Sequence, residues 1–181
     1  GKLREISYLI SKKIKKISPN GLSIKSPKET GKTFKSNARL KVIYFSKFTK
    51  FPVISDDSGL CINALKGKPG IYSARWAKRH GSFFKAMKYI LKIMQNKRDR
   101  SASFVCCLSF KKPGKKIITV EGKVKGSISK KILGNKGFGY DSIFVPFPRS
   151  ITYGQMSKAK KIKSDHRYIA FKNLKKQIKT L

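Results

Sequence analysis

The chain has 181 residues, and its 44 Lys and Arg outweigh 8 Asp and Glu to give a formal charge of +36 at pH 7. A hydrophobic fraction of 39% with 11% aromatic residues argues against wholesale disorder, because these side chains can form a core. No apolar run reaches the ~18 residues that a membrane span needs, and no signal-peptide pattern is present. The three cysteines have no metal-ligand spacing, which predicts a reduced, cytoplasmic setting.

In the first third of the chain, apolar residues recur at helical spacing. This predicts an amphipathic helix over residues 3–14 and a second helix over residues 34–48. Between them, a Pro-Asn-Gly turn at residues 19–21 precedes a short predicted strand that contains Leu22 and Ile24.

The central region begins with an apolar run at residues 52–55 that predicts a short buried strand. The Asp-Asp-Ser-Gly sequence at residues 56–59 predicts a turn at its end, where ligands of α/β proteins commonly bind. A strand over residues 60–65 and a loop over residues 66–70 are expected next. Regular Phe, Met, Ile and Leu spacing then predicts a core-facing helix over residues 83–94.

The second half of the chain changes to paired strands, which we expect over residues 102–110 and 117–124. Two adjacent cysteines in the first of these strands must point to opposite faces, so they are poorly placed to bind one metal together. A strand over residues 142–145 and a helix over residues 165–178 complete the chain. With no internal repeat or linker, the elements predict an α/β domain with a mixed sheet.

The scarcity of acids makes the few that remain informative. Asp56 and Asp57 are adjacent, which costs like-charge repulsion unless a cation or basic groups compensate. The positive charge alone would suit any polyanion, but it is spread along the whole chain rather than gathered in one arm. The paired aspartates are therefore the first candidates for chemistry.

Four polar segments could supply a nucleotide site: Glu29-Thr30-Gly31, residues 56–59, Gly137-Phe138-Gly139-Tyr140-Asp141, and Lys161 with His166-Arg167. They offer carboxylates for Mg²⁺, cations for phosphates and an aromatic ring that could stack on a base. Each segment taken alone is equally well explained as a turn, a buried aromatic or a helix start. Only their joint occurrence favours a functional site.

Together these segments resemble the inosine triphosphate pyrophosphatase family, which hydrolyses non-standard purine nucleoside triphosphates. The matches follow the family order and spacing over nearly the whole chain. They comprise residues 1–6, 29–34, Asn37-Ala38 with Lys41, residues 56–60, residues 64–65, residues 69–75, residues 137–141, residues 152–161 and His166-Arg167.

The resemblance implies an elongated α/β fold, with a mixed sheet and flanking helices in two lobes and the nucleotide in the cleft between them. It implies Mg²⁺-dependent cleavage of ITP, dITP, XTP or dXTP to the monophosphate and pyrophosphate, by a cytoplasmic homodimer. Neither a membrane nor a nucleic acid is required for this activity.

The resemblance also implies roles for individual residues. Asp57 would be the metal-linked general base and Glu29 a second metal carboxylate, supported by Asp56 and Asn37. Lys2 and Lys161 would hold the phosphates, and Ser58 would contact the nucleotide. Phe138 would stack on the purine. The pocket for the 6-oxo group would be formed by Gly139, Tyr140, Asp141, His166 and Arg167.

Elementary chemistry agrees with these implied roles. A triphosphate carries about four negative charges, which cations must offset before a nucleophile approaches phosphorus. Selecting a 6-oxo purine over a 6-amino purine requires donors aimed at that oxygen, and these donors would be left unpaired by adenine.

Three departures from the family pattern stand out. The sequence begins at Gly1, so we expect a single domain over residues 1–181 that lacks the family's opening strand and its Thr/Ser-Gly-Asn turn. Gly154-Gln155 replaces the usual Ala-Glu. Asp165 replaces the usual Ser, although both residues are good helix N-caps.

Three alternatives stay open from the sequence. They are an inactive, truncated relative, a relative that acts on another nucleotide such as a modified pyrimidine, and a basic nucleic-acid-binding protein. The positions of Glu29, Asp56 and Asp57 argue against the last, because a groove that binds a polyanion has no use for three carboxylates together.

Overall fold

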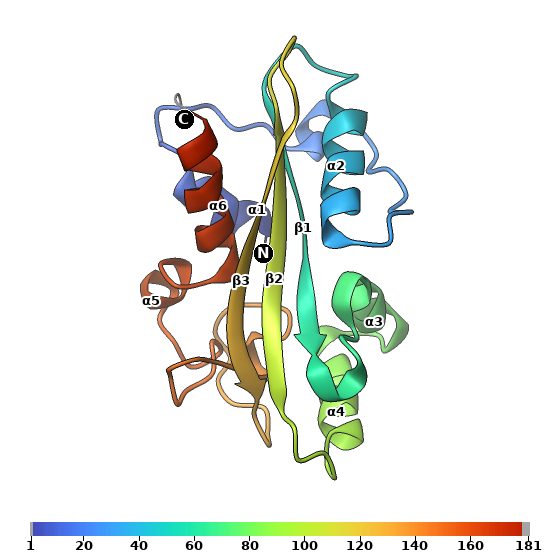
Figure 1. Ribbon diagram of the computed structural model, residues 1–181, viewed down its shortest axis with the longest axis vertical. Helices are drawn as coiled ribbons and strands as arrows, with labels where there is room; N and C mark the ends of the chain where they lie inside the picture. Colours follow the sequence, from blue (N-terminus) through green and yellow to red (C-terminus); the bar gives the residue numbers. More distant parts are fainter. Residues whose placement is uncertain (1, 179–181) are drawn as a thin grey trace. The chain divides into compact units, whose positions relative to one another are not determined.

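The structure of this chain, a computed structural model, describes residues 2–178, with side chains from residue 5 onward. The helices and strands follow one another as α1 (Lys2–Leu9), α2 (Phe34–Phe45), β1 (Val53–Ile62), α3 (Ser73–Arg79), α4 (Phe83–Ile93), β2 (Ser101–Lys111), β3 (Ile118–Ile128), β4 (Phe144–Pro146), α5 (Lys158–Ile162) and α6 (His166–Gln177). Figure 1 shows the three long strands with their helices. In this part of the chain, no helix is both long and apolar enough to cross a membrane.

The strands form one sheet in the order β1-β2-β3-β4, so neighbours in sequence are neighbours in space. Strands β3 and β4 pair antiparallel, with Ser127 opposite Val145. The expected α/β class with flanking helices is confirmed. Among residues 2–178, however, the four strands make an antiparallel rather than a mixed sheet.

The chain divides into two compact units. The α2–α6 unit contains, within the described residues, 2–57, 106–122 and 167–178, and the α3–α4 unit contains 58–105 and 123–166. Both units include parts of the long strands, because the division between them falls within β1, β2 and β3.

The core of the α2–α6 unit lies between the sheet and helices α1 and α6. Residues of α6 at helical spacing face apolar residues of β2 and β3, and Ile6 and Leu9 of α1 pack against the same cluster. The buried members are Cys106, Leu108, Phe110, Val120, Ala170, Phe171, Leu174 and Ile178. Alternation along β2 places Cys107 on the opposite face from Cys106, as expected.

Cys107 is buried and its thiol donates to a Glu121 carboxylate oxygen, with 3.7 Å between sulfur and oxygen. Burial, together with the nearby Glu121 charge, raises the pKa of the Cys107 thiol to about 12. The thiol therefore stays protonated near neutral pH, which makes it a structural rather than a reactive group.

The α3–α4 unit has its own core around β1, α4 and a set of stacked rings. The rings of Phe104 and Phe144 lie 4.5 Å apart, and Tyr153 stacks on Phe144 at 5.6 Å. Leu60 of β1 and Ile90 of α4 are also fully buried and belong to the same unit. These large rings supply buried apolar surface, as the aromatic content of the sequence predicts.

An arginine ties the end of α4 to the end of β3 within the α3–α4 unit. The Arg100 guanidinium donates to the carbonyl oxygens of Met94 at 3.0 Å, Ile128 at 2.7 Å and Ser129 at 2.6 Å. Arginine suits this position because its planar fork of donors can reach several carbonyls at once.

The expected turn at residues 56–59 is wrong, because these residues lie inside β1. Gly59 fits a strand here because the carbonyl of Gly70 and the hydroxyl of Ser73 approach its backbone so closely that a Cβ would overlap both. The Ser73 hydroxyl also accepts a hydrogen bond from the Leu60 N–H at 3.0 Å. The local turn composition was thus overridden by contacts from distant residues.

Other boundaries also differ from expectation. The expected strand at Leu22 and Ile24 is wrong: residues Pro19–Leu22 form a 3₁₀ turn, in which Ser18 accepts a hydrogen bond from the Gly21 N–H. Helix α1 ends at Leu9 rather than residue 14. The remaining expected helices and the long paired strands are present, with ends shifted by a few residues.

Candidate functional site

The extended backbone of β1 points the side chains of the adjacent Asp56 and Asp57 to opposite faces of the strand. Successive side chains of a strand point to opposite faces, so Ser55 and Asp57 share one face while Ile54 and Asp56 share the other. The Ser55 hydroxyl donates to the Ala38 carbonyl of α2 at 2.7 Å, whereas Ile54 packs against the core of the α2–α6 unit, which lies between the sheet and helices α1 and α6. The carboxylates therefore have different partners, which relieves the repulsion expected between them.

On the α2 face, Asp57 is held by a buried asparagine. The Asn37 amide Nδ2 donates to Asp57 Oδ2 at 3.0 Å, and Asn37 Oδ1 accepts from the Gly31 N–H at 2.8 Å. Asn37 is fully buried and Asp57 is 3% exposed. Asn37 thus fixes both the orientation of the Asp57 carboxylate and the approach of the loop before α2.

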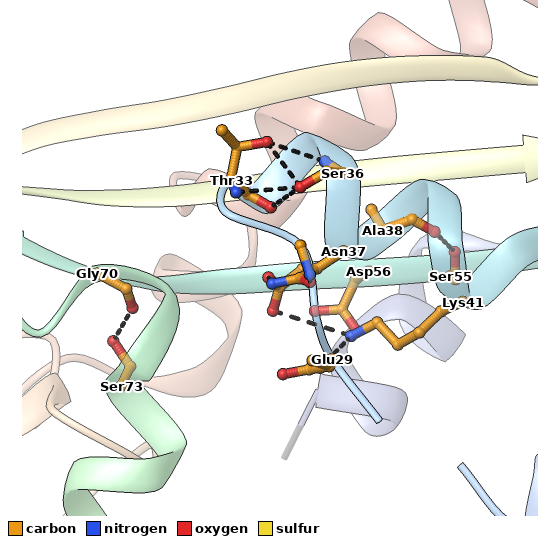
Figure 2. Close-up of polar contacts among 12 residues, drawn as sticks. Glu29, Thr33, Ser36, Asn37, Ala38, Lys41, Ser55, Asp56, Gly70 and Ser73 are labelled. Atoms are coloured by element: carbon orange, nitrogen blue, oxygen red, sulfur yellow. Dashed lines mark hydrogen bonds and ion pairs between the residues drawn. The ribbon is translucent and has the colours of Figure 1, made fainter. Parts of the chain in front are cut away.

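A lysine lies between the two carboxylates that the sequence assigned to a metal. Lys41 Nζ is 2.8 Å from Glu29 Oε1 and 3.8 Å from Asp57 Oδ1. Figure 2 shows Lys41 reaching from α2 toward Glu29, with Asn37 beside them. Lys41 belonged to the matched motif, but its place between Glu29 and Asp57 was not expected from the sequence.

The start of α2 sets the spacing of these groups. Thr33 caps the helix, and its hydroxyl and the Ser36 side chain bond each other's backbone N–H at 3.0 Å (Figure 2). Asn37 and Lys41 are four residues apart and so point to the same face of the helix. Gly31 must be glycine, because a Cβ there would overlap the Ser36 hydroxyl and the Asn37 amide oxygen.

On the other face of β1, Asp56 belongs to a buried ion-pair network. Arg167 Nη1 donates to Glu5 Oε2 at 2.8 Å, and Arg167 Nε lies 3.8 Å from Asp56 Oδ2. Arg167 is 3% exposed. A buried guanidinium requires such compensation by carboxylates.

The α3–α4 unit holds a second cluster. Lys161 Nζ is 2.6 Å from Asp141 Oδ2, and this oxygen also accepts from the Phe138 N–H at 2.8 Å. Lys161 Nζ lies 4.6 Å from the centre of the Phe138 ring. Gly137 has a φ of +79°, and a Cβ at this position would overlap the Asp141 carboxylate. The glycine thus permits the close turn that brings these groups together.

Other residues expected at the nucleotide also lie in this unit. The His166 ring is buried and stacks on Phe104 at 4.8 Å. The Tyr140 hydroxyl donates to the Ser73 carbonyl at 2.9 Å, and burial raises the pKa of Tyr140. Ser58 is buried, and Gly139 has a φ of +68°. The Lys2 side chain, expected at the phosphates, lies outside the described side chains.

Most of the site residues expected from the sequence fall into two clusters, whereas Asp56 and Arg167 belong to the ion-pair network on the other face of β1. Glu29, Asn37 and Asp57, with Lys41, form the carboxylate cluster of the α2–α6 unit. The base cluster of the α3–α4 unit contains Phe138, Gly139, Tyr140, Asp141, Lys161 and His166.

The carboxylate cluster has the donors that Mg²⁺ prefers. Two carboxylates, Glu29 and Asp57, converge on one positive group, the Lys41 ammonium. Among residues 2–178 no group of three or more His, Cys, Asp or Glu side chains is placed to hold a metal ion. Mg²⁺ is typically bound by only one or two carboxylates together with substrate phosphates, so the donor set fits this ion.

The carboxylate cluster and the base cluster each contain acidic and basic side chains, which are the groups that enzymes acting on phosphorylated substrates use. The sequence model of the Ham1 family matches residues 1–177. The chain therefore belongs to the Ham1 family, which confirms the family resemblance recognised in the motifs.

Curated relatives are similar along almost the whole chain. The dITP/XTP pyrophosphatase of Caulobacter vibrioides is 38% identical, over 97% of this chain and 91% of the relative. That of Dictyoglomus thermophilum is 42% identical, over 97% and 88%.

Solved structures of the family share the fold. A Ham1 protein from Coxiella burnetii matches with a TM-score of 0.88 at 31% identity, over 99% of this chain and 94% of that one. The Ham1 protein of Staphylococcus aureus matches with a TM-score of 0.83 at 37% identity, over 89% and 84%.

Proposed function

We propose that this protein hydrolyses non-standard purine nucleoside triphosphates, namely ITP, dITP, XTP and dXTP, to the monophosphate and pyrophosphate. The observation that carries the proposal is the convergence of Glu29 and Asp57 on Lys41. The names of relatives with 38–42% identity support the substrate class. By the family likeness we further propose one catalytic domain over residues 1–181 that acts as a homodimer in the cytoplasm.

In this proposal Glu29 and Asp57 hold Mg²⁺ together with the substrate phosphates. The metal supplies positive charge that offsets the charge of the triphosphate during cleavage. Lys41 keeps the two carboxylates together and can pair with a phosphate oxygen as well. Lys2 contributes a further cation for the phosphates.

Asp57 is proposed as the general base that accepts a proton from the attacking water. Two observations support this role. The carboxylate is almost fully buried, and the Asn37 amide holds one of its oxygens at 3.0 Å. A fixed orientation is what proton transfer in a transition state requires. Asp56, which faces Arg167 instead, supports the position of β1.

The base cluster is proposed to recognise the purine. Phe138 would stack on the base, and Lys161, already beside the Phe138 ring and Asp141, would offer a donor to the 6-oxo group. We therefore propose that Lys161 acts at the purine rather than at the phosphates, where the family resemblance had placed it. His166 and Arg167 complete the recognition of this oxygen, Ser58 contacts the nucleotide, and Gly139 and Tyr140 shape the turn around Phe138.

Substrate preference tests this proposal directly. With Mg²⁺, the protein is expected to release pyrophosphate from dITP and XTP at least about a hundredfold faster, in kcat/KM, than from dATP and dGTP. Chelation of the metal should stop release, and added Mg²⁺ should restore it. Equal rates on all four nucleotides would contradict the substrate assignment, and no release with any of them would contradict the activity.

Asn37→Ala tests how Asp57 is positioned. Loss of the amide leaves the carboxylate without its fixed orientation, so kcat for dITP is expected to fall by roughly tenfold to a hundredfold. The KM for dITP should change little, because Asn37 is not proposed to contact the nucleotide. Lys35→Ala, at an exposed position on the same turn of α2, is the matched control and should keep full activity. Unchanged kcat in Asn37→Ala would contradict the positioning role.

A further inference from the structure

A row of aromatic side chains, none of them assigned a role in the proposed reaction, crosses α3 and α4. Tyr72, Trp76 and His80 are spaced four residues apart, so they line one side of α3 and the turn before it. His80 stacks on Tyr89 of α4 at 4.4 Å, and Trp76 meets the same ring edge-on at 5.7 Å. We call Tyr72, Trp76, His80 and Tyr89 the aromatic row. Figure 1 shows α3 and α4 as neighbours.

The aromatic row is open to solvent at its two ends. The Tyr72 side chain is 47% exposed and Tyr89 is 40% exposed, while Trp76 and His80 are half-buried between them. Phe84, five residues before Tyr89 on α4, is 51% exposed. Exposed rings of this size cost solvation free energy, and several of them gathered on one pair of helices indicate an interaction surface.

Cations lie over the exposed rings. The Arg75 guanidinium is 4.6 Å from the centre of the Tyr72 ring, and Lys88 Nζ is 4.8 Å from the centre of the Phe84 ring. Arg75 and Lys88 are themselves exposed, as are Arg79 and Lys85. Tyr72 and Phe84 are therefore each flanked by a positive group that can reach a phosphate while the ring contacts an apolar surface.

The segment around the row has no acidic residue. From Ser58 to Arg98 the sequence contains ten Lys and Arg and no Asp or Glu. This distinguishes the surface from the carboxylate cluster, whose acids would repel a polyanion. A positive surface without acids is complementary to phosphate groups.

We propose that this surface, the aromatic row with Phe84 and the cations Arg75, Arg79, Lys85 and Lys88, binds single-stranded nucleic acid. Bases stack on the exposed rings, and the cations hold the phosphates. Stacking requires unpaired bases, because a duplex conceals their faces, so single strands are favoured over duplex. A second copy of the chain is a poor occupant, because the same positive surface would face itself.

Fluorescence anisotropy with a labelled thymidine oligonucleotide of about 20 residues tests the charge contribution. Removal of three charges in Arg75→Gln/Arg79→Gln/Lys88→Gln is expected to weaken binding by roughly tenfold or more. The slope of log affinity against log salt should fall by about 2 in magnitude. The control Lys12→Gln/Lys13→Gln/Lys15→Gln removes the same charge from exposed positions without rings, and it should lose less than about threefold. An equal loss in both variants would overturn the proposal.

A second pair of measurements isolates stacking. Tyr72→Ser/Phe84→Ser is expected to weaken binding of the thymidine oligonucleotide by at least about fivefold, because base stacking contributes about 1–3 kcal/mol per base. Binding of an abasic strand of equal length should not change. Thermal melting followed by circular dichroism checks that both substituted residues, which are exposed, leave the fold intact. The proposal would be overturned if the unsubstituted protein bound the abasic strand as tightly as the thymidine strand, or bound duplex more tightly than single strands. It would also be overturned if the substitutions weakened only the self-association of the protein.

Discussion

Asp57→Asn is expected to lower kcat for pyrophosphate release by about three orders of magnitude and to leave the fold intact. A positioned general base contributes about 10²–10⁴ in rate, and the same carboxylate is proposed to hold the metal. Asparagine has nearly the same size as aspartate, and its amide oxygen can still accept the hydrogen bond from Asn37. Steady-state kinetics on dITP, with thermal melting as the measure of folding, gives the result.

Asp56→Asn is the matched control for this experiment. It makes the same chemical change one residue earlier, on the face of β1 where Arg167 lies. It is expected to lower kcat by no more than about tenfold, because Asp56 supports β1 and is not proposed to contact the reacting atoms. Retained turnover in Asp57→Asn, or a larger loss in Asp56→Asn, would remove Asp57 from the role of general base.

Lys161→Met is expected to lower the free energy of unfolding by about 3–5 kcal/mol. The Lys161 and Asp141 side chains are each 4% exposed, and their charged atoms are 2.6 Å apart. Methionine approximates the aliphatic stem of lysine but leaves Asp141 as a buried carboxylate without this cation. Urea unfolding monitored by fluorescence measures the change.

The double variant Lys161→Met/Asp141→Asn separates the ion pair from packing. Asparagine removes the buried charge and can still accept from the Phe138 N–H, so the double variant should recover at least about half of the lost stability. A Lys161→Met loss below about 1 kcal/mol would show that the pair contributes little. A double variant less stable than Lys161→Met would show that Asp141 is not destabilised by loss of its partner.

Several elements could be predicted from the sequence because their patterns are local. The apolar spacing over residues 83–94 predicted α4, and the β-rich segments after residue 101 predicted β2 and β3. The prediction of a turn at the Asp-Asp-Ser-Gly segment was wrong because the contacts that decide its structure are not local. Its composition is typical of a turn, but contacts from Gly70 and Ser73 and pairing within the sheet hold it extended.

The candidate residues of the site could also be named from the sequence, since they stand in motifs at family spacing. The side chains with which they interact could not be predicted from the sequence. Local spacing placed Asn37 and Lys41 on one side of a helix, but it did not show that Lys41 lies between Glu29 and Asp57. The roles proposed for these residues stay predictions that the variants above test.

The sequence by itself determined the family, the fold class and which of the rare acids belong to its motifs. Only the tertiary structure decided how those acids are used: the alternation of β1 places Asp57 with Asn37 and Lys41, and Asp56 with Arg167. Glu5 and Arg167 lie 162 positions apart in sequence, and folding brings them within 2.8 Å. The sequence specifies the type of each residue. The charge environment of each carboxylate instead depends on which side chains, distant in sequence, are buried beside it in the fold.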